Sequence, residues 1–336
     1  MIDVREQLTD DAAAVVMLCS RLGLADGGES RTSPLTLKDW NALARRIHDS
    51  ELKRPGALLG VAAADISKRL EIPDVEAEKL VTLLDRGGAI ALALEQLSSS
   101  GIWCVTRVDD SYPSRVKNLL KHQSPPVLFG AGDSSILDKH ALGVVGSRNV
   151  DEVGAAFARR LGELCTRSSA AVVSGGARGT DRLAMQGALD ADGWAVGMLA
   201  DGLNKTIRQA DVRDFISRGR LVLLTPYQPD SGFSIGAAMG RNKLIYGASD
   251  FAVVVSSELQ KGGTWAGATE ALTAGWCPLF VRSGKDVGAG NQELIKKGAG
   301  AISDTDLNEA DDLIDWMSRN SPSAERPPEQ VQLSFA

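Results

Sequence analysis

Two glycine-rich segments carry arginines at positions suited to holding a phosphate group. Residues 143–148 read Gly-Val-Val-Gly-Ser-Arg, and residues 174–181 read Ser-Gly-Gly-Ala-Arg-Gly-Thr-Asp. Glycines let backbone N–H groups approach a ligand closely, and a helix that begins at such a turn adds partial positive charge. Arg148 and Arg178 can each donate two parallel hydrogen bonds to a phosphate. The two segments therefore predict neighbouring anion-binding turns.

Two later segments could extend this site. Residues 240–243, Gly-Arg-Asn-Lys, place two cations around an amide, which suits phosphate and base contacts together. Residues 261–265, Lys-Gly-Gly-Thr-Trp, place glycines and a hydroxyl at an expected helix start, where Trp265 could stack on a base. The sequence thus predicts four turns that can face one anionic ligand.

Each segment also has a purely structural interpretation. Thr180 or Asp181 could cap the helix that follows, and the residues before Arg148 could form a tight turn with a surface arginine. Arg241 and Lys243 could belong to a solvated basic helix face. An aromatic residue at a helix start packs in the core more often than it binds a base.

Catalytic chemistry has little support in the same region. Residues 141–336 contain no histidine and no P-loop lysine motif, so Ser174 has no base there that would make it a nucleophile. Asp181, Asp201 and Glu270 are the general acid or base candidates near the expected strand ends. The sequence therefore predicts a binding protein with no catalytic residues.

No metal site and no cofactor are expected. The cysteines stand singly, and none of the three histidines is close to one of them in sequence. We expect buried free thiols at Cys19, Cys104, Cys165 and Cys277.

Charge is distributed unevenly along the 336 residues. The net charge is −6, but residues 141–300 hold 18 Lys and Arg against 15 Asp and Glu. An anionic ligand is therefore compatible with this part of the chain. No apolar run approaches the roughly 20 residues that span a bilayer, and the N-terminus does not read as a signal peptide. We expect a cytoplasmic protein without membrane contact.

Alternation of strands and helices from residue 141 predicts a doubly wound, mainly parallel α/β sheet. Strands are expected over 142–145, 170–174, 195–199, 221–224, 251–255 and 278–281, and helices over 155–166, 180–191, 237–247 and 264–274. Residues 1–100 have helical spacing and predict a small all-helical domain. Residues 304–336 predict an acidic helix over 307–317 and a disordered tail. The remaining domain, 101–303, carries all four turns.

The ordered set of motifs resembles the DNA-processing protein A family, also called DprA or Smf. The resemblance runs from about residue 101 to 301, with a looser helical match from residue 35. It rests on Gly101-Ile-Trp-Cys-Val-Thr, Val144-Val-Gly-Ser-Arg, Val173-Ser-Gly-Gly-Ala-Arg-Gly-Thr-Asp, Gly240-Arg-Asn-Lys and Gly290-Asn-Gln-Glu-Leu-Ile. Several motifs in the family's order are more specific than any one of them.

The resemblance implies an extended Rossmann-like fold and a protein that binds single-stranded DNA in a basic pocket. It also implies a homodimer that protects the strand and delivers it to the RecA recombinase during natural transformation. Together, the turns and the resemblance predict a DNA- and phosphate-binding set of Gly146, Ser147, Arg148, Ser174, Gly175, Gly176, Arg178, Gly179, Asp181, Arg241, Asn242, Lys243, Lys261, Gly263 and Thr264.

The sequence departs from the family pattern at several positions. Thr180 stands where the family usually has isoleucine, and Lys243 stands where it usually has arginine. Residues 204–207, Asn-Lys-Thr-Ile, replace an expected Tyr-Pro pair, and the 33 residues after Ser303 are too few for the winged helix found in many members. These departures indicate a divergent branch.

Two other functions fit parts of the pattern. A nucleotide-sensing module, for example in phage defence, could use the same turns to bind one small ligand. The segment from Gly262 to Glu270 is also similar to the glycine-rich element of LOG-type nucleoside-monophosphate phosphoribohydrolases, in which Glu270 would act at the ribose and Arg178 would hold the phosphate.

Overall fold

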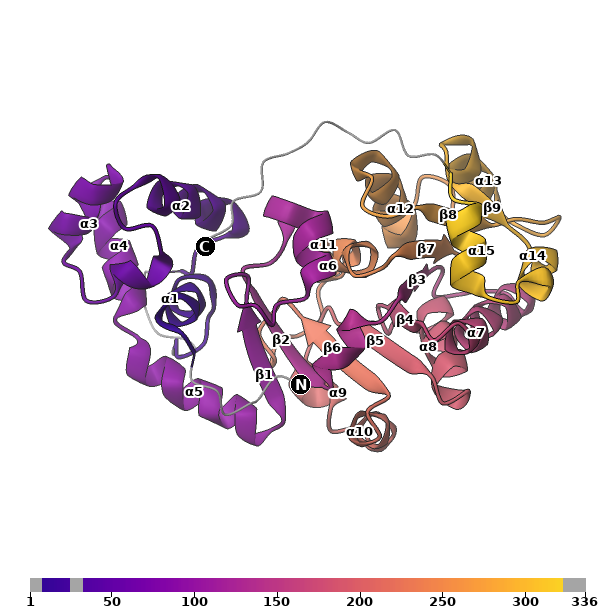
Figure 1. The fold of residues 1–336 in the computed structure, drawn as a ribbon, viewed down its shortest axis with the longest axis horizontal. Coiled ribbons are helices and arrows are strands. Elements are labelled where there is room, and N and C mark those ends of the chain that lie inside the picture. The colour runs from indigo at the N-terminus through magenta and orange to yellow at the C-terminus, as the bar shows by residue number, and fades with distance from the viewer. Residues whose placement is uncertain (1–7, 25–32, 323–336) are drawn as a thin grey trace. The chain divides into compact units, whose positions relative to one another are not determined.

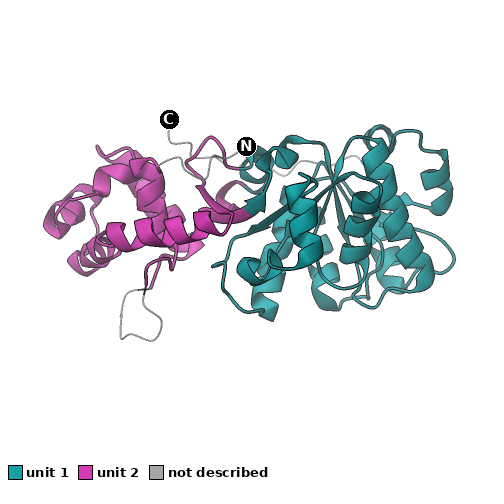
Figure 2. Cartoon of the chain, turned by 90° about the horizontal axis from the view of Figure 1, so that it is seen from below, with its two compact units in different colours: residues 1, 113–120, 131–329 teal, residues 2–112, 121–130, 330–336 magenta. Residues whose placement is uncertain are grey.

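The computed structural model describes residues 8–24 and 33–322, which divide into two compact units. One unit is formed by the chain up to residue 112 together with residues 121–130. The other is formed by residues 113–120 together with the chain from residue 131 (Figure 2). No helix in the described ranges is long and apolar enough to cross a membrane.

The first unit is mainly helical. Helix α2 shows how the sequence produces its elements, because Thr36 and Asp39 form a reciprocal capping box at its start. Trp40 and Ile47 then recur on one face and are fully buried. The elements in chain order are α1 (Asp10–Cys19), α2 (Leu37–Asp49), η1 (Pro55–Leu58), α3 (Ala63–Leu70), α4 (Asp74–Leu84), α5 (Gly87–Ser99), β1 (Ile102–Thr106), η2 (Lys121–Gln123) and most of β2 (Val127–Gly132).

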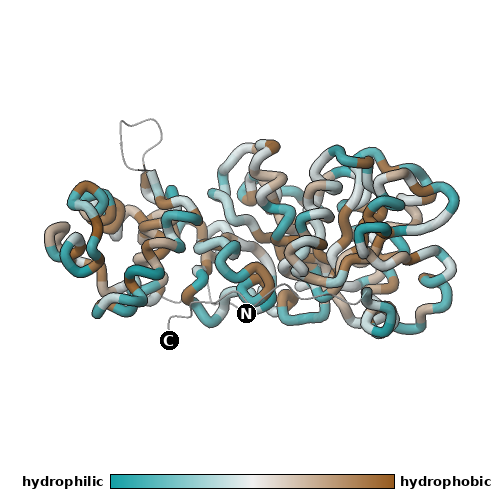
Figure 3. The backbone as a smooth tube through the Cα atoms, turned by 90° about the horizontal axis from the view of Figure 1, so that it is seen from above, coloured by the Kyte–Doolittle hydropathy of each residue, from teal (hydrophilic) through white to brown (hydrophobic). Residues whose placement is uncertain are grey.

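The second unit alternates strands with helices, and β3, β4, β6 and β8 are buried along their whole length. Hydrophobic stretches of the backbone run through the interior of the chain (Figure 3). Its elements are α6 (Ser114–Leu120), η3 (Ser134–Asp138), β3 (Ala141–Val145), α7 (Glu152–Arg167), β4 (Ala171–Ser174), α8 (Thr180–Asp190), β5 (Trp194–Met198), α9 (Leu203–Thr206), α10 (Ala210–Ser217), β6 (Leu221–Thr225), α11 (Ile235–Gly247), β7 (Phe251–Val254), α12 (Gly262–Ala274), β8 (Leu279–Arg282), α13 (Ala289–Lys296), β9 (Gly300–Ile302), α14 (Asp304–Glu309) and α15 (Leu313–Arg319).

Within the second unit the strands lie in the order β6-β5-β4-β3-β7-β8-β9, and this ladder is parallel throughout. Val145 pairs with Val254, and Ser174 pairs with Gly197, so the strands end at a common edge. Helices α7 and α8 cover one face, while α11 and α12 cover the other (Figure 1). The connections from β3 and from β7 run in opposite directions along the sheet. This is the switch point where doubly wound sheets bind ligands.

Helices α7 and α8 cross backbone against backbone at two glycines. A Cβ atom at Gly162 would lie 2.3 Å from the carbonyl oxygen of Ala184, and one at Gly187 would lie 2.3 Å from that of Arg159. Both positions therefore require glycine. The contact fixes α8, which begins at the second glycine-rich turn.

The structure confirms the predicted doubly wound fold and differs from the prediction in detail. The predicted strands match β3 to β8 within one residue at each end, but β9 and the helices α9 and α10 were not predicted. The single helix predicted over 307–317 is wrong. Helix α14 ends at Glu309, and Asp312 caps a new helix by accepting a hydrogen bond from the Asp315 N–H. The predicted disordered tail falls on residues 323–336, which lie outside the described residues.

Candidate functional site

The turns after β3 and β4 are packed against each other so tightly that two of their residues must be glycine. A Cβ atom at Gly146 would lie 2.5 Å from Thr180 Oγ1. Gly179 has φ +89° and ψ −132°, and a Cβ atom there would lie 2.5 Å from the carbonyl oxygen of Arg148. The two predicted turns therefore form one structure.

Hydrogen bonds hold these two turns in place. The backbone N–H and the Oγ1 of Thr180 both donate to the carbonyl oxygen of Ser147, each over 3.2 Å. Ser174 is fully buried, and its Oγ donates to the carbonyl oxygen of Val144 over 2.5 Å. Neither hydroxyl caps a helix or faces solvent, so both act in building the turn.

Asp181 also faces into the turns. Its carboxylate is buried and accepts hydrogen bonds from the backbone N–H groups of Gly175, Ala177 and Gly146. Burial raises the pKa of Asp181 to about 6, against the lowering effects of Arg241 and of these hydrogen bonds. The N-cap of α8 is Gly179, which offers no side-chain acceptor. The alternative that Thr180 or Asp181 caps α8 is therefore wrong.

Arg241 reaches this site from α11 on the opposite face of the sheet. Its side chain is 5% exposed, and its Nη1 lies 1.7 Å from the position that a Cβ atom of Gly175 would occupy. Burial lowers the pKa of Arg241, although Asp181 opposes this shift. Within the described part of the chain, Nε and Nη1 of Arg241 have no hydrogen-bond acceptor. A buried guanidinium with free donors is suited to an anion that enters the site.

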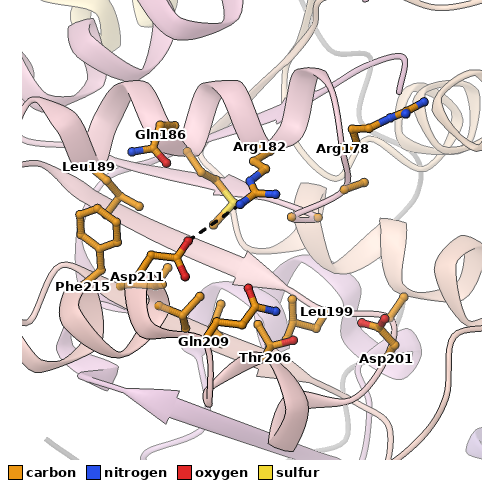
Figure 4. Close-up of a pocket in the computed structure, with 18 of the residues that line it drawn as sticks. Arg178, Arg182, Gln186, Leu189, Leu199, Asp201, Thr206, Gln209, Asp211 and Phe215 are labelled. Carbon is orange, nitrogen blue, oxygen red and sulfur yellow. Dashed lines mark ion pairs between the residues drawn. The ribbon is translucent and has the colours of Figure 1, made fainter. Parts of the chain in front are cut away.

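A cavity of about 530 Å³ lies beside these turns. It is bounded by the two turns, α8, the loop after β5, α10, β6 and α11, and it is lined by four arginines and two aspartates. Two arginines at the turns are exposed. Arg178 donates to Asn149 Oδ1 over 2.7 Å, and the Arg148 guanidinium lies 5.4 Å from the centre of the half-exposed Phe233 ring. Arg178 and Asp201 lie at one end of the cavity (Figure 4).

The structure separates the predicted binding residues into two groups. Those that line the cavity are Arg148, Gly175, Gly176, Arg178 and Arg241. The other predicted residues lie outside its lining, and some of them support the turns. The Oγ1 of Thr264 donates to the carbonyl oxygen of Gly146 over 3.1 Å, and Asn242 Nδ2 donates to that of Gly263 over 3.2 Å.

The remaining predicted cations have different surroundings. Burial lowers the pKa of Lys243, and the opposing charge of Glu270 offsets only part of this shift. Lys261 is exposed at the N-cap of α12. Among the described residues, no group of three or more His, Cys, Asp or Glu side chains could hold a metal ion.

Sequence reasoning missed the part of the cavity formed by α8 and α10. Arg182, Gln186 and Leu189 lie three or four residues apart on α8, and all three line the cavity with Phe215 of α10. Their spacing places all three side chains on one face of a helix, which the sequence alone indicates. That this face borders a cavity follows only from the position of α10 opposite α8 in the structure.

Comparison with known proteins decides the family. A family model described as "DNA recombination-mediator protein A" matches residues 103–315 of this chain. The chain belongs to this family. The DNA processing protein DprA of Bacillus subtilis is 27% identical over 298 residues, which cover 87% of this chain and 93% of that protein. A putative DprA of Mycobacterium tuberculosis is 30% identical over 203 residues, covering 58% of this chain and 50% of that one.

Solved structures of DprA proteins share the fold. The Streptococcus pneumoniae DprA structure superposes with a TM-score of 0.66 at 20% identity, covering 90% of this chain and 98% of that chain. A structure of Helicobacter pylori DprA, described as giving insights into its single-stranded DNA binding mode, has a TM-score of 0.53 at 22% identity. It covers 66% of this chain and 97% of that one. The fold of the recombination-mediator family thus extends through most of this chain.

Proposed function

We propose that this chain binds single-stranded DNA at the cavity beside β3 and β4. In this proposal it protects the strand and delivers it to the RecA recombinase, as a recombination mediator. The observation that carries the proposal is the buried guanidinium of Arg241, whose Nε and Nη1 have no acceptor among the described residues. Membership of the recombination-mediator family and the DNA-binding description of the H. pylori relative support it.

The position of the arginines favours a single strand over a duplex. Arg148 and Arg178 are exposed at the turns, whereas Arg241 is 5% exposed within the cavity lining. A phosphate must therefore enter the cavity to reach Arg241. A flexible single strand can bend a phosphate inward, whereas the stiff backbone of a duplex cannot.

The test is fluorescence anisotropy with a labelled single strand and the matching duplex at several salt concentrations. A strand of about 30 nucleotides is long enough to span several binding sites. We expect tight binding of the single strand alone. Arg148→Ala and Arg178→Ala should each weaken it about tenfold or more, because each removes a charge-assisted hydrogen bond. Each should also reduce the salt slope by about 0.7 for every phosphate that the variant no longer neutralises.

Arg159→Ala is the matched control for these variants. Arg159 is exposed on α7 and lies outside the cavity lining, and its replacement removes the same charge. It should leave the affinity almost unchanged. Equal affinities of the two turn variants and the wild type would refute the proposed site, and equal binding of duplex and single strand would refute the strand preference.

The partners and the absence of catalysis form separate parts of the proposal. If the chain forms a homodimer, light scattering should give twice the chain mass at concentrations above the dissociation constant. If it delivers DNA to RecA, it should co-purify with added RecA and speed the loading of RecA onto a coated strand.

If the chain has no catalytic activity, nucleoside 5′-monophosphates should stay intact when incubated with it. Release of a free base by the wild type, but not by Glu270→Gln, would assign the chain to hydrolysis instead.

A further inference from the structure

The carboxylate of Asp181 occupies backbone donors that the two glycine-rich turns would otherwise offer to a ligand. It is buried at the start of α8 and accepts hydrogen bonds from the N–H groups of Gly146, Gly175 and Ala177, which belong to both turns. Backbone N–H groups in such turns are common partners of a bound phosphate. Here a side chain of the protein already satisfies them. A phosphate at this site therefore depends on the arginine side chains more than on these N–H groups.

Asp181 and Arg241 approach the same point from helices on opposite faces of the sheet. A Cβ atom at Gly175 would lie 1.7 Å from Arg241 Nη1 and 2.6 Å from Asp181 Oδ2. Nε and Nη1 of Arg241 nevertheless have no acceptor within the described ranges, so Asp181 acts on these two atoms through its charge alone. Arg241 thus has a neighbouring anion but keeps donors for a second one.

Asp181 is the group at this site whose charge changes near neutral pH. Burial raises its pKa to about 6, against the lowering effects of Arg241 and of the backbone hydrogen bonds. Burial also raises the pKa of the two nearby tyrosines, so they stay protonated, and no histidine is among the described residues that line the cavity. The other charged or titratable groups that face the Asp181–Arg241 pair are Arg148 of the turn after β3, Asp201 of the loop after β5, Tyr227 of the loop after β6, and Tyr246 of α11.

The negative charge of Asp181 opposes the binding of a phosphate at Arg241. An ionised Asp181 attracts the guanidinium and repels a second anion, and both effects are strong in a buried site. A protonated carboxyl group can still accept hydrogen bonds from the turns, but it leaves the charge of Arg241 to the ligand. A bound phosphate in turn favours the protonated form of Asp181. Phosphate binding and proton uptake therefore support each other.

We propose that Asp181 competes with the phosphate for Arg241, and that the chain takes up a proton from solvent at Asp181 when a phosphate-bearing ligand binds. The inference rests on the proposed function for its phosphate site and adds control of that site by pH. Asp181 does not contact the ligand in this account. It is a positioning residue that acts through Arg241. Affinity is highest below the pKa of the free protein, about 6, and falls as the pH rises above it.

The first test measures protons and affinity in the wild type. A single strand of about 30 nucleotides is titrated by calorimetry at pH 6.5 in two buffers of different ionisation enthalpy, and the difference gives the protons taken up. We expect net uptake, with an upper limit of about one proton per occupied site. Anisotropy at constant salt should show about tenfold tighter binding at pH 5.5 than at pH 8, the factor for a rise of one pKa unit on binding.

Two variants assign the proton to Asp181. Asp181→Asn should bind the strand equally at both pH values and take up no proton, with an affinity near that of the wild type at pH 5.5. Asp201→Asn is the matched control, because it removes the same charge from the cavity beside Arg241. It should change the affinity by a similar factor at both pH values and keep the proton uptake. The proton count in the wild type decides the question even if Asp181→Asn does not fold.

Sulfate, whose charge is constant over this pH range, separates the inference from the proposed function. Its binding is measured by the rise in melting temperature of the wild type and Asp181→Asn at both pH values. If the strand binds equally at both pH values without proton uptake, or if uptake persists in Asp181→Asn, the inference is refuted and DNA binding stands.

A different result would refute the proposed function instead. In that case no strand binds, while sulfate stabilises the wild type more at pH 5.5 than at pH 8 and stabilises Asp181→Asn equally at both. The role of Asp181 then stands without DNA. If neither the strand nor sulfate binds, both proposals are refuted.

Discussion

Replacing Arg241 with methionine is expected to weaken DNA binding and to stabilise the folded protein. The Arg241 side chain is 5% exposed, and two of its nitrogen atoms have no acceptor in the described chain. A buried polar group without a partner costs about 1–3 kcal/mol, and burial of the charge adds to that cost. Methionine has a similar length and no such donors. Arg241→Met should therefore raise the free energy of unfolding by about 1–3 kcal/mol at pH 5.

The gain should shrink at higher pH because of Asp181. Its pKa is raised to about 6, so its carboxyl group is mostly neutral at pH 5 and ionised at pH 8. Arg241 favours the ionised form. Without Arg241 the pKa of Asp181 rises further, and ionisation of the buried carboxyl costs more free energy. The stabilisation in Arg241→Met is thus expected to be largest below pH 6.

Urea unfolding at pH 5 and pH 8 measures the stability change, and anisotropy with a single strand measures binding. Affinity should fall about tenfold to a hundredfold, since one hydrogen bond to a charged group contributes about 1.5–3 kcal/mol. Arg241→Lys, which keeps the charge, should lose less affinity. Lower stability of Arg241→Met than wild type at pH 5 would refute the reasoning, because it would mean that the nitrogen atoms are satisfied in the folded protein.

Three further variants test the turns. Gly179→Ala should lower the free energy of unfolding by about 2–3 kcal/mol and abolish DNA binding, because φ +89° and the contact with the Arg148 carbonyl oxygen exclude a side chain. Thermal unfolding measures the change in stability, and anisotropy measures binding. An unchanged melting temperature would contradict this prediction. Ser174→Ala should cost about 1 kcal/mol in urea unfolding through loss of the hydrogen bond to Val144 while DNA affinity stays within twofold, and a large loss of affinity would show direct contact. The raised pKa of Asp181 means that the folded state holds this proton more tightly, so stability should fall by roughly 3 kcal/mol as pH rises from about 4 to 6. Asp181→Asn should flatten that part of a pH series of urea unfolding, and an unaltered slope would assign it to another group.

The sheet could be predicted from the sequence because its strands are short, continuous apolar runs with glycine-rich ends. The helices between β5 and β6 were missed because they are short: α9 has four residues and α10 has eight. Val212, Phe215 and Ile216 have helical spacing on α10, but three residues over two turns are a weak signal in a sequence. The break between α14 and α15 depends on the Asp312 cap, which a helical interpretation of residues 307–317 overlooked.

The site was predicted at the level of its turns, but the sequence could not assign roles within them. Glycines and arginines mark an anion site in any such turn. Whether Ser174 and Asp181 face the ligand or the interior depends on how two turns pack, which is a tertiary property. The burial of Arg241 depends in the same way on α11 reaching the site from the other face of the sheet.

The crossing of α7 and α8 at Gly162 and Gly187 has a consequence for affinity. Two backbones in direct contact leave α8 no room to shift or tilt, and α8 begins at the phosphate turn. The turn is therefore preorganised, and little conformational entropy is lost when a phosphate arrives. Two glycines far from the ligand thereby set part of the free energy of binding, and a larger side chain at either one should weaken binding mainly through the entropy of association.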